Sequence, residues 1–220
     1  AAVREGRTVY DNIKKVISWT LPTNAGEALT IILALFLGMA LPITAVQILW
    51  VNLITAVTLG LALAFEPSEP GTMRRPPRPR QEPLLSGSLI WQIAFVSMLF
   101  LAAVFGIYAY ATDAGYPLPL AQTMAMNMLV VLEILYLFYI RNLHGPSLTW
   151  AAAKGTGVVW ASVVTVTTAQ VAITYLPPLQ RIFGTQAVPL LDGLLILGTG
   201  LVFFALIEIE KQMRLALRRA

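Results

Sequence analysis

Residues 45–65 read AVQILWVNLITAVTLGLALAF, a run without a single charged side chain. A helix needs roughly 20 apolar residues, about 30 Å at 1.5 Å per residue, to cross the hydrocarbon core of a bilayer. Lipid offers no partner for unpaired backbone amides and carbonyls, and a barrel strand would need only about half this length. The run therefore predicts a membrane-spanning helix.

The rest of the chain has the same character. Of its 220 residues, 57% are hydrophobic and 12% are charged, and the mean hydropathy is +0.73. These values lie outside the balance of soluble globular domains. The sequence predicts an all-α fold, an integral membrane bundle of six transmembrane helices. The predicted spans are residues 15–39, 45–65, 89–111, 120–140, 156–176 and 190–209.

Basic residues alternate between the two sides of the predicted bundle. All of the 15 Lys and Arg residues except Arg181 fall on one side, which the positive-inside rule makes cytoplasmic. Both termini are then cytoplasmic, and the protein is expected to be multi-pass, in a plasma membrane, with the lipid bilayer as its surroundings. The net charge of +4 is not gathered on a soluble domain, so we expect no nucleic-acid binding.

The spans divide the chain into segments. We predict a cytoplasmic stalk, a first helical pair with candidate cation ligands, a cytoplasmic loop rich in Pro and Arg, four further helices and a basic tail. These cover residues 1–14, 15–65, 66–88, 89–210 and 211–220. The loop is either a spacer against anionic headgroups or a docking strip for a soluble domain. Because the first methionine is Met39, inside the first span, we expect the chain to be a fragment of a longer protein.

Two carboxylates are predicted to lie within the membrane, Glu27 in the first span and Glu133 in the fourth. An ionisable side chain at the bilayer centre costs roughly 2.5 to 3.5 kcal/mol on insertion scales. Such residues persist mostly where they face a cavity, a partner or an ion. The two carboxylates are therefore candidate ligands of a transported cation.

Neutral oxygen ligands accompany them. Asn24 lies three residues before Glu27 on one helix face, and Asn52 and Thr55 repeat this spacing in the second span. Oxygen ligands suit Ca²⁺, Mg²⁺, Na⁺ or K⁺. Cysteine is absent and the single histidine, His144, falls in a predicted loop. The alternative is that these polar residues join helices, as we interpret Gln170. We interpret Tyr136 as a packing or interfacial residue.

Pro22 lies five residues before Glu27. A proline inside a helix lacks the backbone donor and clashes with the carbonyl of the fourth residue before it, here Ser18. The sequence therefore predicts a break in the helical hydrogen bonding, and a kink, close to the candidate ligands.

Several local sequences resemble type II P-type ATPases, the calcium and sodium pump branch. Residues 5–15 (EGRTVYDNIKK) resemble the stalk entering the fifth helix of that family, and residues 49–55 (LWVNLIT) resemble its sixth helix. Residues 73–78 (MRRPPR) and 82–86 (EPLLS) are similar to the following loop. Residues 131–133 (VLE) resemble the eighth helix, and residues 175–179 (YLPPL) the loop before the last helix. The resemblance implies the last six helices of a ten-helix pump.

The resemblance also implies roles for single residues. Asn24, Glu27, Asn52, Thr55 and Glu133 match cation-coordinating positions of the calcium-pump pattern. Where that pattern usually has an aspartate, this chain has Ala56. The lost negative charge argues for fewer ions, for a monovalent ion, or for protons sharing the site.

The family phosphorylates an aspartate in an Asp-Lys-Thr-Gly-Thr motif, and this sequence contains neither that motif nor a phosphate-binding glycine loop. We expect no cofactor on this chain, and Mg-ATP to act on the full-length pump. The remaining N-terminal helices and cytoplasmic domains of the pump are the implied partners, and one of those helices is expected to supply a further acidic ligand. Our hypothesis is that the first span transmits the phosphorylation state to the ligands, and that protons replace the departing cation.

Two other classes of function remain open at this point. A self-contained secondary transporter or channel would move ions without ATP. A regulatory or scaffolding membrane subunit would not need Glu27 or Glu133.

Overall fold

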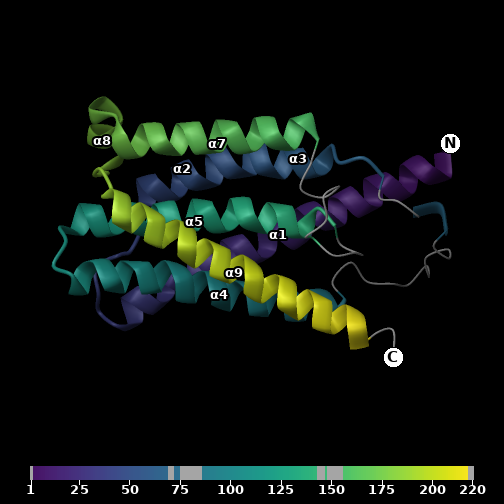
Figure 1. The fold of residues 1–220 in the computed structure, drawn as a ribbon, viewed down its shortest axis with the longest axis horizontal. Coiled ribbons are helices and arrows are strands. Elements are labelled where there is room, and N and C mark those ends of the chain that lie inside the picture. The colour runs from purple at the N-terminus through teal and green to yellow at the C-terminus, as the bar shows by residue number, and fades with distance from the viewer. Residues whose placement is uncertain (1, 69–71, 75–85, 143–146, 148–155, 218–220) are drawn as a thin grey trace.

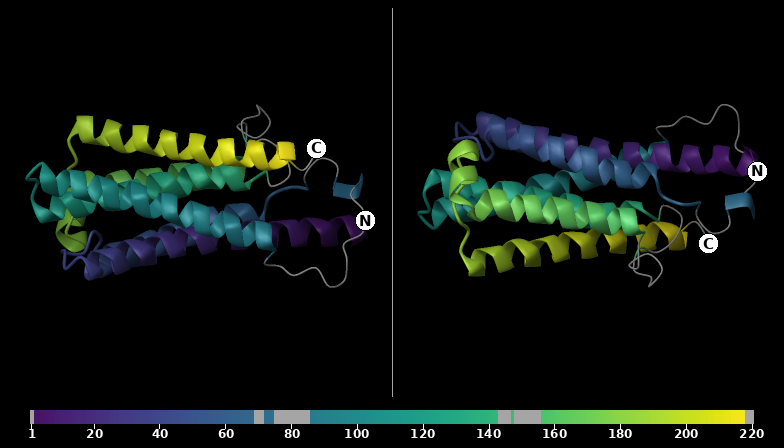
Figure 2. Two further views of the ribbon diagram at one scale, coloured as in Figure 1. Left: turned by 90° about the horizontal axis from the view of Figure 1, so that it is seen from below. Right: turned by 90° about the horizontal axis from the view of Figure 1, so that it is seen from above.

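The computed structural model describes residues 2–68, 72–74, 86–142, 147 and 156–217. Within these ranges the secondary structure is helical, with no strand, so the all-α prediction is confirmed. The long helices run side by side along one axis (Figure 1), and views turned by 90° show the same bundle (Figure 2).

The helices follow the predicted spans closely. Apolar runs form the helices, and polar caps begin three of them: Thr44 accepts a hydrogen bond from Gln47 N, Ser86 accepts one from Leu89 N, and Thr156 accepts one from Val159 N. The elements are α1 (Ala2–Phe36), α2 (Ala45–Thr55), the π-helix η1 (Ala56–Gly60), α3 (Leu61–Ala64), the 3-10 helix η2 (Thr72–Arg74), α4 (Gly87–Asp113), α5 (Leu118–Ile140), α7 (Gly157–Tyr175), α8 (Pro177–Phe183) and α9 (Leu190–Leu217).

Five helices among the described residues are long and apolar enough to cross a membrane. They are the continuous helix of α2, η1 and α3 (residues 45–64), α4, α5, α7 and α9. The chain is therefore an integral, multi-pass membrane protein. The remaining predicted span, residues 15–39, lies largely in α1, which is helical throughout, but Pro22, Asn24 and Glu27 lower its hydropathy. That α1 also crosses the membrane stays a prediction.

α5 is the central helix, since most of its residues are buried, whereas fewer than half are buried in each of the other four candidate spans. α4 and α9 pack along α5, and α1 packs most extensively against α4. Two glycines allow close approach: a Cβ at Gly26 would lie 2.5 Å from the Phe100 Cβ, and one at Gly200 would lie 2.6 Å from Val131 Cγ1. Gly26 therefore sets how closely α4 approaches α1 next to Glu27.

α1 begins and α9 ends at the same end of the bundle, while α8 lies at the opposite end (Figure 1). Arg181 belongs to α8, whereas Arg7 and Lys211 lie on the parts of α1 and α9 nearest the two termini. The charge alternation in the sequence thus corresponds to two ends of the bundle. The predicted Pro/Arg-rich loop falls largely on residues 69–71 and 75–85, which, like His144, lie outside the described residues.

Candidate functional site

Glu27 on α1 faces α2 within the bundle. Its side chain is buried, and its Oε2 accepts a hydrogen bond from Asn52 Nδ2 at 2.8 Å. Asn52 also donates to the carbonyl of Ile48 one turn earlier, at 3.2 Å, which fixes the orientation of the amide. The structure thus brings together two of the predicted ligands, from two different helices.

Glu133 approaches the same place from α5. The residue is only 1% exposed, and the Thr55 side chain and the charge of Glu27 lie within interaction range of its carboxylate. The Thr55 hydroxyl donates to the carbonyl of Val51 at 2.8 Å, so its oxygen lone pairs remain available as acceptors or ligands. Four of the five predicted ligands therefore form one cluster between α1, α2 and α5.

Two oxygens in this cluster have no hydrogen-bond donor among the described residues. They are Glu27 Oε1 and Glu133 Oε2, and both are buried. A buried carboxylate oxygen normally has a donor or a cation beside it, because desolvation of an unpaired charge is costly. The cluster therefore has two acceptors oriented inward that the described part of the chain does not satisfy.

Asn24 lies apart from this cluster. Its residue is exposed on α1, whereas Glu27, three positions later, is buried. Asn24 and Glu27 were expected to share a helix face, but only Glu27 is buried. Residues three apart in a helix differ by about 60° in direction, which is enough to place Asn24 outside the bundle. Within the described residues, no group of three or more His, Cys, Asp or Glu side chains is placed to hold a metal ion.

Directly after Thr55 the second span changes from α-helix to π-helix, beginning at Ala56. Such π-helical segments are rare and often occur at functional sites. The amide of Ala56 points to the carbonyls of both Asn52 and Leu53. The sequence shows no signal for this change, which alters the backbone at the position where the resemblance implied an aspartate.

At the end where both termini lie, α1 is tied to the segment after α3. Asn12 Nδ2 donates to the carbonyls of Ala64 and Glu66, at 3.0 and 2.8 Å. The Glu66 carboxylate accepts from Arg141 Nε at 2.7 Å in a buried ion pair that reaches the end of α5. Arg7 Nη1 donates to the carbonyl of Thr72 at 2.7 Å. The beginning of α1 is thus joined to the second span and to α5.

A second polar cluster joins α2, α5 and α7. Gln170 Nε2 donates to Asn127 Oδ1 at 2.7 Å, Thr174 donates to the same oxygen at 3.1 Å, and Trp50 Nε1 donates to Gln170 Oε1 at 3.3 Å. Asn127, Gln170 and Thr174 border a largely apolar cavity of about 530 Å³ between α5, α7 and α9. Because its oxygens accept donors from the chain itself, this cluster joins helices, as the sequence interpretation of Gln170 proposed.

Comparison with known proteins gives a consistent picture. The family model described as "Cation transporting ATPase, C-terminus" matches residues 40–213. The chain is 45% identical over 188 residues to the "Probable cation-transporting ATPase F" of Mycobacterium tuberculosis (strain ATCC 25618 / H37Rv), an alignment that covers 86% of this chain and 21% of that protein.

Two further relatives are similar to this chain at lower sequence identity. The "Cation-transporting ATPase pma1" of Synechocystis sp. is 36% identical over 190 residues, covering 84% of this chain and 21% of the relative. The "Calcium-transporting ATPase 1" of Bacillus cereus is 34% identical over 226 residues, covering 96% and 25%. The chain thus spans between a fifth and a quarter of the length of these relatives. With a family model matched over most of its length, this chain belongs to the family of C-terminal membrane regions of cation-transporting P-type ATPases.

Proposed function

We propose that this chain supplies part of the cation-binding site of an ATP-driven pump, with Glu27, Asn52, Thr55 and Glu133 as ligands and Asn24 at its edge. The observation that carries the proposal is the pair of buried carboxylates from α1 and α5, each with an oxygen that lacks a partner in the part of the chain that the structure describes. Two carboxylates this close repel one another when both are ionised. A cation between them, or protons on them, would remove that repulsion.

The alternative, that these polar residues only join helices, fits the cluster around Glu27 and Glu133 poorly. Interhelical hydrogen bonds such as that between Asn127 and Gln170 pair a donor with an acceptor. Glu27 and Glu133 instead bring two acceptors together, and Asn52 of the second span donates to one of them, Glu27. An arrangement rich in acceptors and poor in donors is typical of a site for a hard cation.

The site would be completed by parts of the pump outside this chain. Asn24 presents its amide on the exposed side of α1, where a polar group facing lipid would be unfavourable. We place another helix of the same pump there, carrying a further ligand. On this proposal α1 is the sixth span, both chain ends face the cytoplasm, and ATP is hydrolysed by domains outside this chain. The plasma-membrane location stays a prediction.

Coupling would pass through α1. Its beginning is bonded to the segment after α3 through Asn12, and its middle carries Glu27. A continuous helix of 35 residues can transmit a tilt from one end to the ligand. Tilting α1 would separate Glu27 from Asn52 and Glu133 and release the cation.

The ion itself is proposed only as a class. The oxygen ligands suit Ca²⁺, Na⁺, K⁺ or Mg²⁺, and Ala56 lowers the negative charge available to them. Fewer ions, a monovalent ion, or protons sharing the site would each compensate. Proton counter-transport through Glu27 and Glu133 follows if protons take the place of the released ion.

The test uses the full-length pump with Glu27→Gln and, separately, Glu133→Gln. Phosphoenzyme formation from ATP is measured while Ca²⁺, Na⁺, K⁺ and Mg²⁺ are each titrated. We expect the activating cation to be needed at concentrations at least about 100-fold higher in each variant, since a charged ligand is lost. Asp113→Asn, which neutralises an exposed carboxylate at the end of α4, is the control. Unchanged cation dependence in both glutamine variants would overturn the ligand assignment.

A further inference from the structure

Pro22 leaves a backbone carbonyl inside α1 without its helical hydrogen-bond donor. Because proline has no backbone N–H, the Ser18 carbonyl loses its helical donor, yet Ser18 is buried. α1 nevertheless stays helical from Ala2 to Phe36, across the proline. A buried carbonyl without a donor would be costly, so some other group must replace the missing amide.

The replacement donor comes from α5. Tyr136 Oη donates to the Ser18 carbonyl at 2.9 Å, and accepts from Gln92 Nε2 of α4 at 2.9 Å. Ser97, also on α4, donates to the carbonyl of Pro22 at 3.1 Å. Side chains of α4 and α5 thus serve the carbonyls on both sides of the break. The Tyr136 ring is completely buried, so water does not compete for these bonds.

This bond joins the two segments that carry the carboxylates. Tyr136 lies one turn after Glu133 on α5, and Ser18 lies on α1 about two and a half turns before Glu27. A second bond holds the same two segments together, from Trp19 Nε1 to the Glu133 carbonyl at 3.2 Å. The sliding and rotation of α1 against α5 are therefore fixed close to the cation site.

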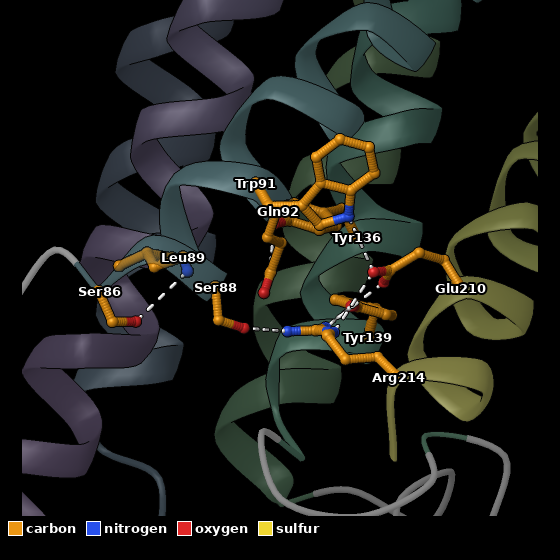
Figure 3. A network of polar contacts seen from close by, with 9 residues as sticks. All are labelled: Ser86, Ser88, Leu89, Trp91, Gln92, Tyr136, Tyr139, Glu210 and Arg214. Atoms are coloured by element: carbon orange, nitrogen blue, oxygen red, sulfur yellow. Dashed lines mark hydrogen bonds and ion pairs between the residues drawn. The ribbon is translucent and has the colours of Figure 1, made fainter. Parts of the chain in front are cut away.

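Tyr136 is itself held from the far side. Its ring stacks on Tyr139 with centroids 5.5 Å apart and packs edge-on against Phe100. Arg214 of α9 donates to the Tyr139 hydroxyl at 3.2 Å and to the Ser88 hydroxyl at 2.9 Å. Figure 3 shows the two tyrosines between the α4 residues and the α9 residues of this network. The phenol is thus held in one orientation before it meets α1.

We propose that Tyr136 is a positioning residue for the cation site: its hydroxyl takes the place of the amide that Pro22 lacks, and so holds the α1 segment leading to Glu27 against Glu133. This inference rests on the proposed function, because it assigns Tyr136 an effect on cation binding. Tyr136 itself would not touch the cation, and from the sequence alone it is interpreted only as a packing residue.

The first test is Tyr136→Phe in the full-length pump, with Tyr108→Phe as the matched control. Tyr108 is also fully buried and also donates to a backbone carbonyl, that of Ala40, at 2.9 Å, but at the end of the bundle remote from Pro22. We expect Tyr136→Phe to raise the half-activating cation concentration about five- to tenfold while the maximal phosphoenzyme level stays near that of the unmodified pump. Tyr108→Phe should leave the half-activating concentration unchanged.

The second test is rescue. Pro22→Ala returns a backbone N–H that can bond to the Ser18 carbonyl, so the double variant P22A/Y136F should recover most of the lost cation affinity. If Tyr136→Phe alone does not fold, the double variant should recover folded protein as well. A double variant no better than Tyr136→Phe in affinity and yield, or a Tyr136→Phe pump with unchanged cation dependence, overturns the proposal.

Failure of this proposal is separable from failure of the proposed function. If Glu27→Gln shifts the cation dependence and Tyr136→Phe does not, the ligand assignment stands and the role of Tyr136 falls. If neither glutamine variant shifts it, the ligand assignment falls first.

Discussion

Buried carboxylates at the ends of the bundle differ from those in its middle in the partners that surround them. At one end, Glu66 forms an ion pair with Arg141. At the other end, Asp192 at the start of α9 is buried, and its two oxygens accept hydrogen bonds from Tyr110 at 3.2 Å and Tyr116 at 3.0 Å. In both places the chain itself provides the partner for the negative charge.

In the middle, Glu27 and Glu133 each keep an oxygen that has no donor among the described residues. Glu208, near the end of α9, is intermediate: one oxygen accepts from Ser147 N and Gln212, and the other has no partner within the described ranges. Among the described residues, Glu66 and Asp192 at the ends thus have a partner for their negative charge, whereas the two carboxylates at the centre each keep an unpaired oxygen. Because an unpaired charge is most costly there, the difference indicates a place for a guest rather than a deficiency of packing.

The largest expected effect is on stabilisation by the cation itself. A ligand that binds only the folded state stabilises it by about 4 kcal/mol at a thousand times its Kd. We expect the activating cation to raise the thermal unfolding temperature of the detergent-solubilised full-length pump without ATP, and the double variant E27Q/E133Q to lose this increase. Without cation, the double variant should be at least as stable as the unmodified pump, since two unpaired carboxylates have been removed.

Asp192→Asn provides the comparison from the end of the bundle. It also neutralises a buried carboxylate, but one that the chain already satisfies. The stabilisation by cation should be retained in this variant. A double variant E27Q/E133Q that still gains the full stabilisation would contradict the distinction between middle and ends.

A smaller effect is expected when an end carboxylate is made to resemble those in the middle. Arg141→Met removes the guanidinium from the buried Glu66 carboxylate while keeping an apolar stem of similar length. Breaking a buried ion pair from one side costs about 3 kcal/mol. Thermal unfolding of the full-length pump should show this loss, while the half-activating cation concentration stays unchanged. A variant with normal stability and altered cation dependence would place Glu66 in the transport site instead.

The sequence predicted the long helices well because bilayer thickness dictates apolar runs of a fixed length. The predicted spans 89–111 and 120–140 lie inside the observed α4 and α5. The short helix α8 was missed, since Pro177 and Pro178 were interpreted only as a loop. Both prolines occupy its first turn, where a missing N–H has no cost. The π-helix η1 left no pattern in the sequence at all.

For the candidate site, the sequence predicted the positions of some residues correctly and those of others not. Carboxylates in an apolar run are conspicuous, so Glu27 and Glu133 could be selected, and their ligand role stays a prediction. Asn24 was grouped with Glu27 by helical spacing, yet burial separates them, because spacing does not say which neighbours a helix face meets. Tyr136 was interpreted as packing, although Pro22 signalled that Ser18 would need a donor. The missing information was the register of α5 against α1.

The smallest expected effect concerns Tyr116 and the pH dependence of stability. Its hydrogen bond to Asp192 raises the pKa of the Tyr116 phenol above its ordinary value of about 10, because loss of the phenolic proton would place two negative groups together. A group whose pKa is raised by folding stabilises the protein fully below the unfolded value and loses that contribution as pH rises through the folded value. The bond therefore contributes at neutral pH and is lost above about pH 10.

Tyr116→Phe removes this contribution at every pH. The difference in unfolding temperature between the unmodified pump and the variant should be small and constant near neutral pH, and should shrink as the buffer is raised above about pH 10. Tyr175→Phe is the control, because that hydroxyl donates to the backbone carbonyl of Val188 and not to a carboxylate. A difference that grows at alkaline pH would mean that Asp192 does not depend on the Tyr116 proton. Asp192 would then be closer in character to the carboxylates at the centre.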